Sequence, residues 1–147
     1  MPEETHETPV SDIMSSPVVT VTQETTIAEA AGVLADEHVG SLVVGEDIIE
    51  GIITETDIVR AVGDGISLDE TTVAEIMTDP VVTIRPHESV QVAGERMGHN
   101  GVKKLPVTED GEPVGIVTTT DLAHFFPRNR IKMASQPERD VEEGEFE

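Results

Sequence analysis

The sequence contains no cysteine, so disulfide bonds and metal sites built from thiolates are excluded. No apolar run approaches the roughly 18 residues that a membrane-spanning helix needs. The first ten residues are acidic, whereas a secretory signal peptide begins with basic residues. From these absences we expect a cytoplasmic protein with no membrane partner.

Basic residues are also scarce, with nine Lys and Arg against 30 Asp and Glu and a formal net charge of −21. Residues 11–127 hold 21 acidic and five basic side chains, so a net −16 belongs to the part expected to fold. Such a surface repels the phosphates of nucleic acids, which are therefore not expected partners. Because molar salt shortens the screening length to about 3 Å and relieves self-repulsion, the composition predicts a halophilic, archaeal source. An ordinary acidic protein is the alternative.

The chain repeats itself at an offset of 63 residues. The segment DIMSSPVVTV at residues 12–21 is echoed by EIMTDPVVTI at residues 75–84. A second motif, GIITETD at residues 51–57, is echoed by GIVTTTD at residues 115–121, now at an offset of 64. One additional residue is therefore expected in the second unit, in a turn around Asp110 and Gly111.

Each unit has the residue pattern of a strand, a helix, a hairpin and a second helix. Apolar residues at i, i+3, i+4 and i+7 from Ile27 and from Val90 indicate one buried helix face. The remaining elements are predicted at 18–21, 41–45, 48–54 and 56–62, and again at 81–84, 104–108, 113–118 and 120–125. One unit leaves a sheet face bare, so two must pack together. The sequence predicts an α+β fold of two βαββα units related by a pseudo-twofold axis.

The predicted organisation has five parts. A mobile N-terminal arm at 1–10 precedes the first repeat at 11–62. A polar linker at 63–72 contains a Gly-Asp-Gly turn signal and leads to the second repeat at 73–127. Residues 128–147 lack periodicity and end in a charged run, which predicts a mobile acidic C-terminal tail.

The doubled opening and closing motifs resemble a tandem pair of cystathionine-beta-synthase-type (CBS) domains over residues 11–127. The resemblance implies a regulatory, ligand-sensing module that binds AMP, ADP, ATP or S-adenosylmethionine in clefts between the repeats. It also implies a homodimer that acts on an unidentified effector protein. The alternative is a structural or assembly module whose clefts are empty and which regulates a partner through dimerisation.

No residue pattern predicts catalysis or a metal site. The sequence has neither a phosphate-binding loop nor a complete Gly-x-Gly-x-x-Gly fingerprint, and its five histidines show no metal-ligand spacing. No nucleophile and base can be paired. We therefore expect no enzymatic activity, and we expect an adenine nucleotide to act as a regulatory ligand rather than as a catalytic cofactor.

The closing motifs hold most of the candidate site residues. A Thr followed three residues later by an acid is typical of a helix N-cap. The same helix N-terminus offers free N–H groups to a phosphate. The resemblance implies that the Asp holds the ribose hydroxyls and that the Thr hydroxyls contact ribose or phosphate. Cap and site are compatible, and the candidates are Thr54, Thr56 and Asp57 in the first repeat and Thr118, Thr120 and Asp121 in the second.

Lys103 and Lys104 are candidate phosphate ligands, because two adjacent cations stand out in a chain this poor in them. The alternative is that one lysine pairs with a nearby carboxylate on the surface. The first repeat has Gly40 and Ser41 at the matching positions, so the two clefts are predicted to differ. Thr20 and Thr83, at the ends of the opening strands, are candidates for the adenine pocket by the same resemblance, although β-propensity explains them equally well.

Overall fold

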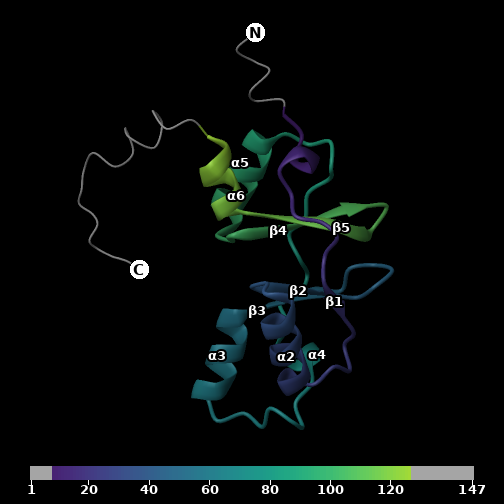
Figure 1. The fold of residues 1–147 in the computed structure, drawn as a ribbon, viewed down its shortest axis with the longest axis vertical. Coiled ribbons are helices and arrows are strands. Elements are labelled where there is room, and N and C mark those ends of the chain that lie inside the picture. Colours follow the sequence, from purple (N-terminus) through teal and green to yellow (C-terminus); the bar gives the residue numbers. More distant parts are fainter. Residues whose placement is uncertain (1–7, 127–147) are drawn as a thin grey trace, which may run out of the picture.

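Two small β-sheets lie face to face at the centre of the molecule, and helices cover their outer faces (Figure 1). The computed structural model describes residues 8–126. The predicted C-terminal tail and most of the predicted N-terminal arm lie outside the described residues. Each repeat supplies one sheet, so the predicted α+β architecture of two repeats is confirmed.

The first repeat forms its elements in the predicted order. They are β1 (Thr20–Val21), α2 (Ile27–Glu37), β2 (Ser41–Val44), β3 (Gly51–Thr54) and α3 (Glu55–Gly63). Strand β2 lies in the middle, parallel to β1 and antiparallel to β3. Thr26 and Glu29 form a capping box that starts α2 in the predicted register. The apolar residues predicted to share one face, spaced from Ile27 to Leu34, therefore form the buried face of the helix.

The second repeat follows the same order but lacks the opening strand predicted at 81–84. Its elements are α5 (Val90–Asn100), β4 (Lys104–Glu109), β5 (Glu112–Thr118) and α6 (Thr119–Phe125). Only Ile84 pairs with β4, in a single parallel bridge. In the first repeat the Val43 N–H donates to the Val19 carbonyl at 3.0 Å. The residue that corresponds to Val43 is Pro106, which has no N–H and cannot make this bond.

The hairpin of the second repeat turns at Asp110 and Gly111, as the Asp-Gly pair predicts. Both residues have positive φ, 54° and 85°, which suits a two-residue turn. The additional residue of this repeat coincides with a register shift between Val107 and Thr108. The tip of this hairpin meets the first hairpin, because the Ile49 N–H donates to the Gly111 carbonyl at 3.0 Å.

The segment that opens each repeat packs against the core of the other repeat. The short 3-10 helix η1 (Val10–Asp12) places Val10 in the hydrophobic core of the second repeat, and Met14 packs against the same core. Conversely, α4 (Val73–Ile76) places Val73 in the core of the first repeat. Each core is therefore completed by residues that precede the other repeat along the chain.

Backbone hydrogen bonds hold each opening segment against the other repeat. Ser15 and Ile116 donate to each other's carbonyls at 2.9 and 3.0 Å. Beside this bridge Met14 covers Gly115, and a Cβ on this glycine would overlap the methionine side chain. The equivalent bridge in the first repeat joins Thr78 and Ile52, and beside it Met77 covers Gly51. These contacts explain the glycine that begins each closing motif.

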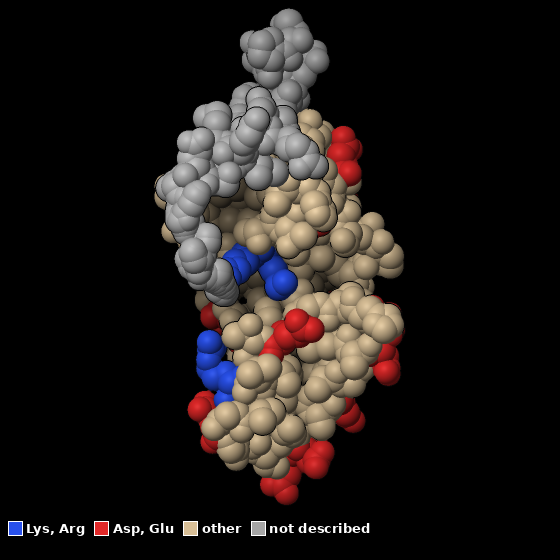
Figure 2. All heavy atoms as spheres, turned by 60° about the vertical axis from the view of Figure 1, so that its left-hand side comes forward, with Lys and Arg blue, Asp and Glu red and all other residues tan. Residues whose placement is uncertain are grey.

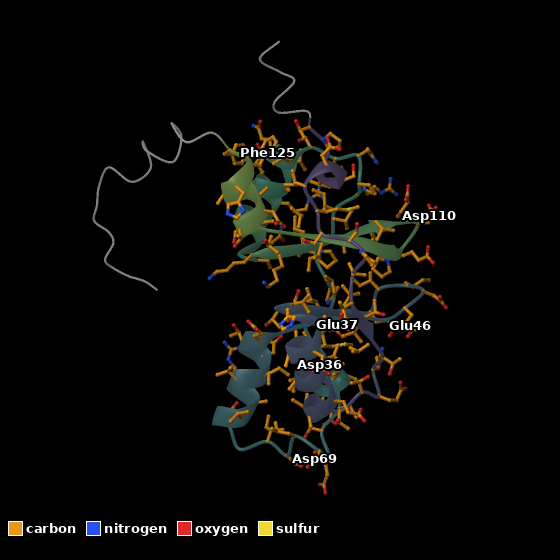
Figure 3. The ribbon with its side chains drawn as sticks, in the orientation of Figure 1. Asp36, Glu37, Glu46, Asp69, Asp110 and Phe125 are labelled. Atoms are coloured by element: carbon orange, nitrogen blue, oxygen red, sulfur yellow. The ribbon has the colours of Figure 1, made fainter. Side chains whose placement is uncertain are left out.

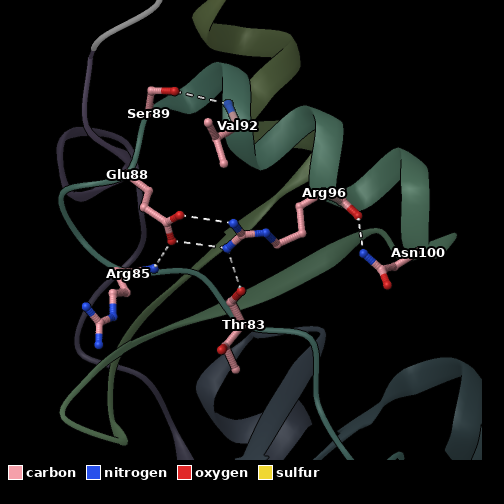
Figure 4. A network of polar contacts seen from close by, with 7 residues as sticks. All are labelled: Thr83, Arg85, Glu88, Ser89, Val92, Arg96 and Asn100. Atoms are coloured by element: carbon pink, nitrogen blue, oxygen red, sulfur yellow. Dashed lines mark hydrogen bonds and ion pairs between the residues drawn. The ribbon is translucent and has the colours of Figure 1, made fainter.

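An ion pair anchors the start of the second repeat (Figure 4). The Arg96 guanidinium donates to both carboxylate oxygens of Glu88, at 3.1 and 3.0 Å, and to the Thr83 carbonyl at 3.0 Å. The Arg85 N–H also donates to Glu88, at 2.9 Å. The hydrogen bonds from Arg96 hold the pKa of Glu88 below its ordinary value, against partial burial, which raises it.

We expect Glu88→Gln to lower the free energy of unfolding by about 1 kcal/mol at neutral pH, because the pair is charge-assisted but only partly buried. A lowered pKa means that folding favours the carboxylate. The contribution is therefore complete above the ordinary Glu range and is lost as pH falls through the lowered pKa. Denaturant unfolding from pH 7 to pH 3 measures this.

Glu29→Gln is the matched control, because Glu29 accepts a backbone N–H in its capping box but has no arginine partner among the described residues. It should leave stability almost unchanged. A difference between wild type and Glu88→Gln that does not shrink at low pH would contradict an electrostatic role for the pair.

Candidate functional site

A hollow lies between the two sheets, and we call it the inter-repeat cleft. The first repeat supplies most of its lining and the second repeat the rest: Ser15, Pro17, Val18, Val19, His38, Val39, Gly40, Ser41 and Val43, then Lys104, Ile116 and Thr118. The valines and the isoleucine form an apolar wall, and hydroxyl and basic groups lie beside it. Figure 2 shows the molecule hollowed at its waist, with basic side chains at the edge of the hollow.

The closing motif of the second repeat contributes Thr118 to the cleft. The Thr118 N–H donates to Oδ2 of Asp121 at 2.8 Å, and the Asp121 N–H donates to the Thr118 hydroxyl at 3.2 Å. These bonds form a capping box at the start of α6. Oδ1 of Asp121 meets no donor among the described residues. Thr120 follows on the first turn of α6 and is exposed.

The closing motif of the first repeat forms the same cap on α3 but does not line the inter-repeat cleft. Oδ2 of Asp57 accepts from both the N–H and the hydroxyl of Thr54, at 2.9 and 3.1 Å. Oδ1 of Asp57 lies 4.0 Å from the guanidinium of Arg60. Thr56 is exposed on the first turn of the helix. None of these three predicted residues is among those that line the cleft.

The two predicted lysines lie in different surroundings. Lys104 lines the cleft, and its Nζ lies 3.6 Å from the position that a Cβ on Gly40 would take. Lys103 is exposed and does not line this cleft, while its carbonyl accepts the N–H of Thr119 at 3.0 Å. A Cβ at position 40 would therefore be in ordinary van der Waals contact with the Lys104 cation from the opposite repeat.

A carboxylate lies close to the same point. Oε1 of Glu55 is also 3.6 Å from the Cβ position of Gly40. Glu55 and Lys104 therefore face the edge of the cleft together, one from each repeat. They are not within 4.0 Å of each other, so they form no direct ion pair.

The two predicted threonines of the opening strands do not line the cleft. Thr20 pairs with Val43 in the sheet of the first repeat. The backbone of Thr83 is held by Arg96 through its carbonyl. Both remain predictions as adenine-pocket residues.

Most residues that line the cleft were missed by the sequence analysis. The opening segment from Ser15 to Val19 and the connection from His38 to Ser41 supply nine of the lining positions together with Val43. The signal that could have found them is the repeated proline-valine motif itself, which the sequence analysis interprets as a strand and as part of the family resemblance but not as part of a site. This motif lies beside the closing motif of the other repeat because each opening segment packs against the core of the other repeat.

The described part of the chain contains neither a cluster of metal-ligating side chains nor a helix that could span a membrane. Residues 8–126 contain no group of three or more His, Asp or Glu side chains arranged to hold a metal ion. None of the helices described is both long enough and apolar enough to cross a bilayer.

A βαββα repeat and a second repeat that lacks only the opening strand, with facing sheets and capped closing helices, define a tandem CBS pair. The chain belongs to the CBS domain family, whose model matches residues 10–64 and 73–128. Such a pair is a regulatory module and is generally non-catalytic. No activity therefore follows from the fold itself.

Known proteins and solved structures agree with this assignment. The chain is 34% identical over 116 residues to the CBS domain-containing protein YhcV of Bacillus subtilis, which covers 78% of this chain and 82% of YhcV. The CBS domain pair of protein MJ0100, solved with 5′-methylthioadenosine and S-adenosyl-L-methionine, matches with a TM-score of 0.73 and 33% identity over 81% of this chain and 95% of that one. PAE2072 from Pyrobaculum aerophilum, complexed with AMP, matches with a TM-score of 0.75 and 28% identity over 86% and 98%.

Some relatives are much longer than this chain. Homoserine O-acetyltransferase from Methanosalsum zhilinae is 36% identical over 124 residues, which cover 82% of this chain but only 24% of that enzyme. The similarity therefore concerns a CBS pair that also occurs as a part of larger proteins.

Proposed function

We propose that this protein is a regulatory module that binds an adenosine ligand, namely AMP, ADP, ATP or S-adenosylmethionine, in the inter-repeat cleft. The observation that carries the proposal is the composition of that cleft. An apolar wall, a helix N-terminus that begins at Thr118 and the ammonium group of Lys104 meet in one hollow. The ligands bound to the MJ0100 pair and to PAE2072 support the same ligand class.

The residues of the cleft suit the three parts of such a ligand. The apolar wall accepts an adenine ring, which is flat and buries well against branched side chains. Asp121 is not itself among the lining residues, but it caps α6 beside Thr118 with Oδ2 only, so Oδ1 is available to accept ribose hydroxyls. Lys104 and the positive N-terminal end of the α6 dipole favour a phosphate. Asp57, Thr54, Thr56 and Lys103 would serve the pseudo-symmetric position, with Thr120, Thr20 and Thr83 as further candidates.

Ligand binding would change the angle between the repeats. Because the cleft is lined by both repeats, a bound ligand stabilises one relative orientation over others, which is a population shift. An effector protein or a second copy of this chain would respond to that orientation. We place the protein in the cytoplasm, where adenine nucleotides are available.

We expect Asp121→Asn to weaken AMP binding by roughly tenfold to a hundredfold, because a charged acceptor of two hydroxyl hydrogen bonds contributes about 1.5 to 3 kcal/mol. Asparagine retains an oxygen for the Thr118 N–H, so the helix cap should survive. Isothermal calorimetry with AMP, ADP, ATP, adenosine and S-adenosylmethionine measures the affinities, and thermal melts check the cap.

Asp57→Asn is the matched control, since Asp57 caps α3 in the same way but its partner Thr54, unlike Thr118, does not line this cleft. It should leave binding to the inter-repeat cleft unchanged. If none of the five compounds gives heat with the wild-type protein, ligand sensing is wrong and the assembly module with empty clefts takes its place.

A homodimer is the second part of the proposal. Val59 and Val62 of α3 are 69% and 56% exposed, although both are large apolar residues, and they lie one turn apart on the same helix face. Exposed apolar patches on a small protein favour association. A second copy of the chain would cover them.

We expect light scattering at micromolar concentration to give about twice the chain mass of 15.8 kDa. The double variant Val59→Asp and Val62→Asp should give a monomer, because the charges would have to be buried in the interface. Ile48→Ser, a change at an exposed apolar residue on a hairpin, is the control and should leave the dimer intact. A monomeric wild-type protein would contradict this.

We also infer that the protein works at high salt, and the comparisons do not by themselves indicate such a source. Glu46 and Asp110 lie at the ends of the two hairpins, on the same side of the molecule (Figure 3). The hairpins meet through the bond between Ile49 and Gly111, so like charges gather around this contact. Salt should relieve their repulsion.

The melting temperature should therefore rise between dilute buffer and molar KCl. Combining Glu46→Gln with Asp110→Asn should reduce this dependence, and asparagine tolerates the positive φ at position 110. A wild-type melting temperature that does not rise with salt would contradict the inference that the protein works at high salt.

A further inference from the structure

We propose that two copies of the chain pair head to tail, so that α3 of each copy packs against α5 and α6 of its partner. The proposal rests on the homodimer of the proposed function and names the two surfaces that form it. Three observations carry it: the positions of α3 and α6, the different sizes of their outer side chains, and the unequal charges of the two repeats.

The two closing helices lie on one side of the molecule. Helices α3 and α6 are both on the left-hand side of Figure 1, and they come from different repeats. A second copy that covers this side can be related to the first by a twofold axis in two ways. Either α3 meets α3 and α6 meets α6, or α3 of each copy meets α6 of the other.

The outer surfaces of the two repeats differ in size. Val59 of α3 is 69% exposed, and its counterpart on α6, at the offset of 64, is the smaller and also exposed Ala123. On α5, Gly94 faces α6, since a Cβ there would lie 3.6 Å from the Leu122 side chain, and one turn further a Cβ on Gly98 would meet no atom within 4 Å. A large side chain thus projects from the first repeat where the second repeat is low. The two surfaces therefore fit each other better than either fits itself.

The charges of the two repeats favour the same pairing. Residues 11–72 hold 13 acidic and one basic side chain, whereas residues 73–126 hold eight acidic and four basic side chains. Helices α2 and α3 carry five carboxylates and one arginine, while α5 and α6 carry two carboxylates, one arginine and two histidines. If the first repeats met each other, their carboxylates would face like charges. A head-to-tail pair instead places the acidic helices against the less acidic surface.

The sequence contains no cysteine, so an introduced thiol can report which surfaces meet. We expect that a short bis-maleimide joins neither Val59→Cys nor Ala123→Cys alone into a covalent dimer, because head-to-tail pairing keeps each position away from its own copy. An equimolar mixture of the two variants that has exchanged subunits should be joined. About half of its dimers hold one chain of each kind, so about half of the protein should run at twice the chain mass on a denaturing gel.

Ile48→Cys is the matched control, because Ile48 is exposed on a hairpin and belongs to neither surface. It should give only background cross-linking, both alone and mixed with either of the other variants. Each replacement keeps a small or medium-sized uncharged side chain, so light scattering before the reagent is added should still give a dimer.

The outcomes separate this inference from the proposed function. Cross-linking of Val59→Cys alone at the level of the mixture would overturn the inference, because the two α3 helices would then meet each other, while the homodimer would stand. A mixture that stays at the Ile48→Cys background would also overturn it, because the two surfaces would not be in contact. A monomeric wild-type protein overturns the homodimer and this inference together, whereas ligand binding is tested separately by calorimetry.

Discussion

The crossing of the two opening segments is the constraint on which the rest of this structure depends. Met14 covers Gly115 in the second repeat, and Met77 covers Gly51 in the first. The opening segment must therefore pass between the two sheets before its own repeat begins. This path brings Ser15 against the closing strand of the second repeat and leaves a hollow beside it. The cleft is a consequence of the interlocked cores, since it exists only where both repeats are in place.

The same crossing explains why the cleft combines residues of opposite repeats. Most of the lining comes from the first repeat, while the helix cap and the lysine come from the second. Lys104 of the second repeat reaches Gly40 of the first, because its Nζ lies 3.6 Å from the position that a Cβ on Gly40 would take. A molecule in this cleft would touch both sheets and would respond to their relative orientation.

The two repeats differ most where the second has lost part of its sheet. Pro106 removes a ladder hydrogen bond that Val43 makes in the first repeat. In the second repeat the Arg96 guanidinium holds the Thr83 carbonyl and the Glu88 carboxylate instead. A side-chain anchor thus fixes the segment that the backbone fixes elsewhere, and the pKa of Glu88 is lowered as a result.

The sequence by itself determined the order of elements, the buried face of α2, the caps at Thr54 and Thr118 and the turn at Asp110. These features depend on residues within a few positions of one another, so local patterns suffice to predict them. Only the tertiary structure decided which repeat each opening segment completes, and with it the lining of the cleft. The two repeats have nearly the same motifs, so the sequence pattern alone does not say whether Met14 packs against Gly51 or against Gly115. The choice between them follows from how the two sheets face each other, which no local pattern contains.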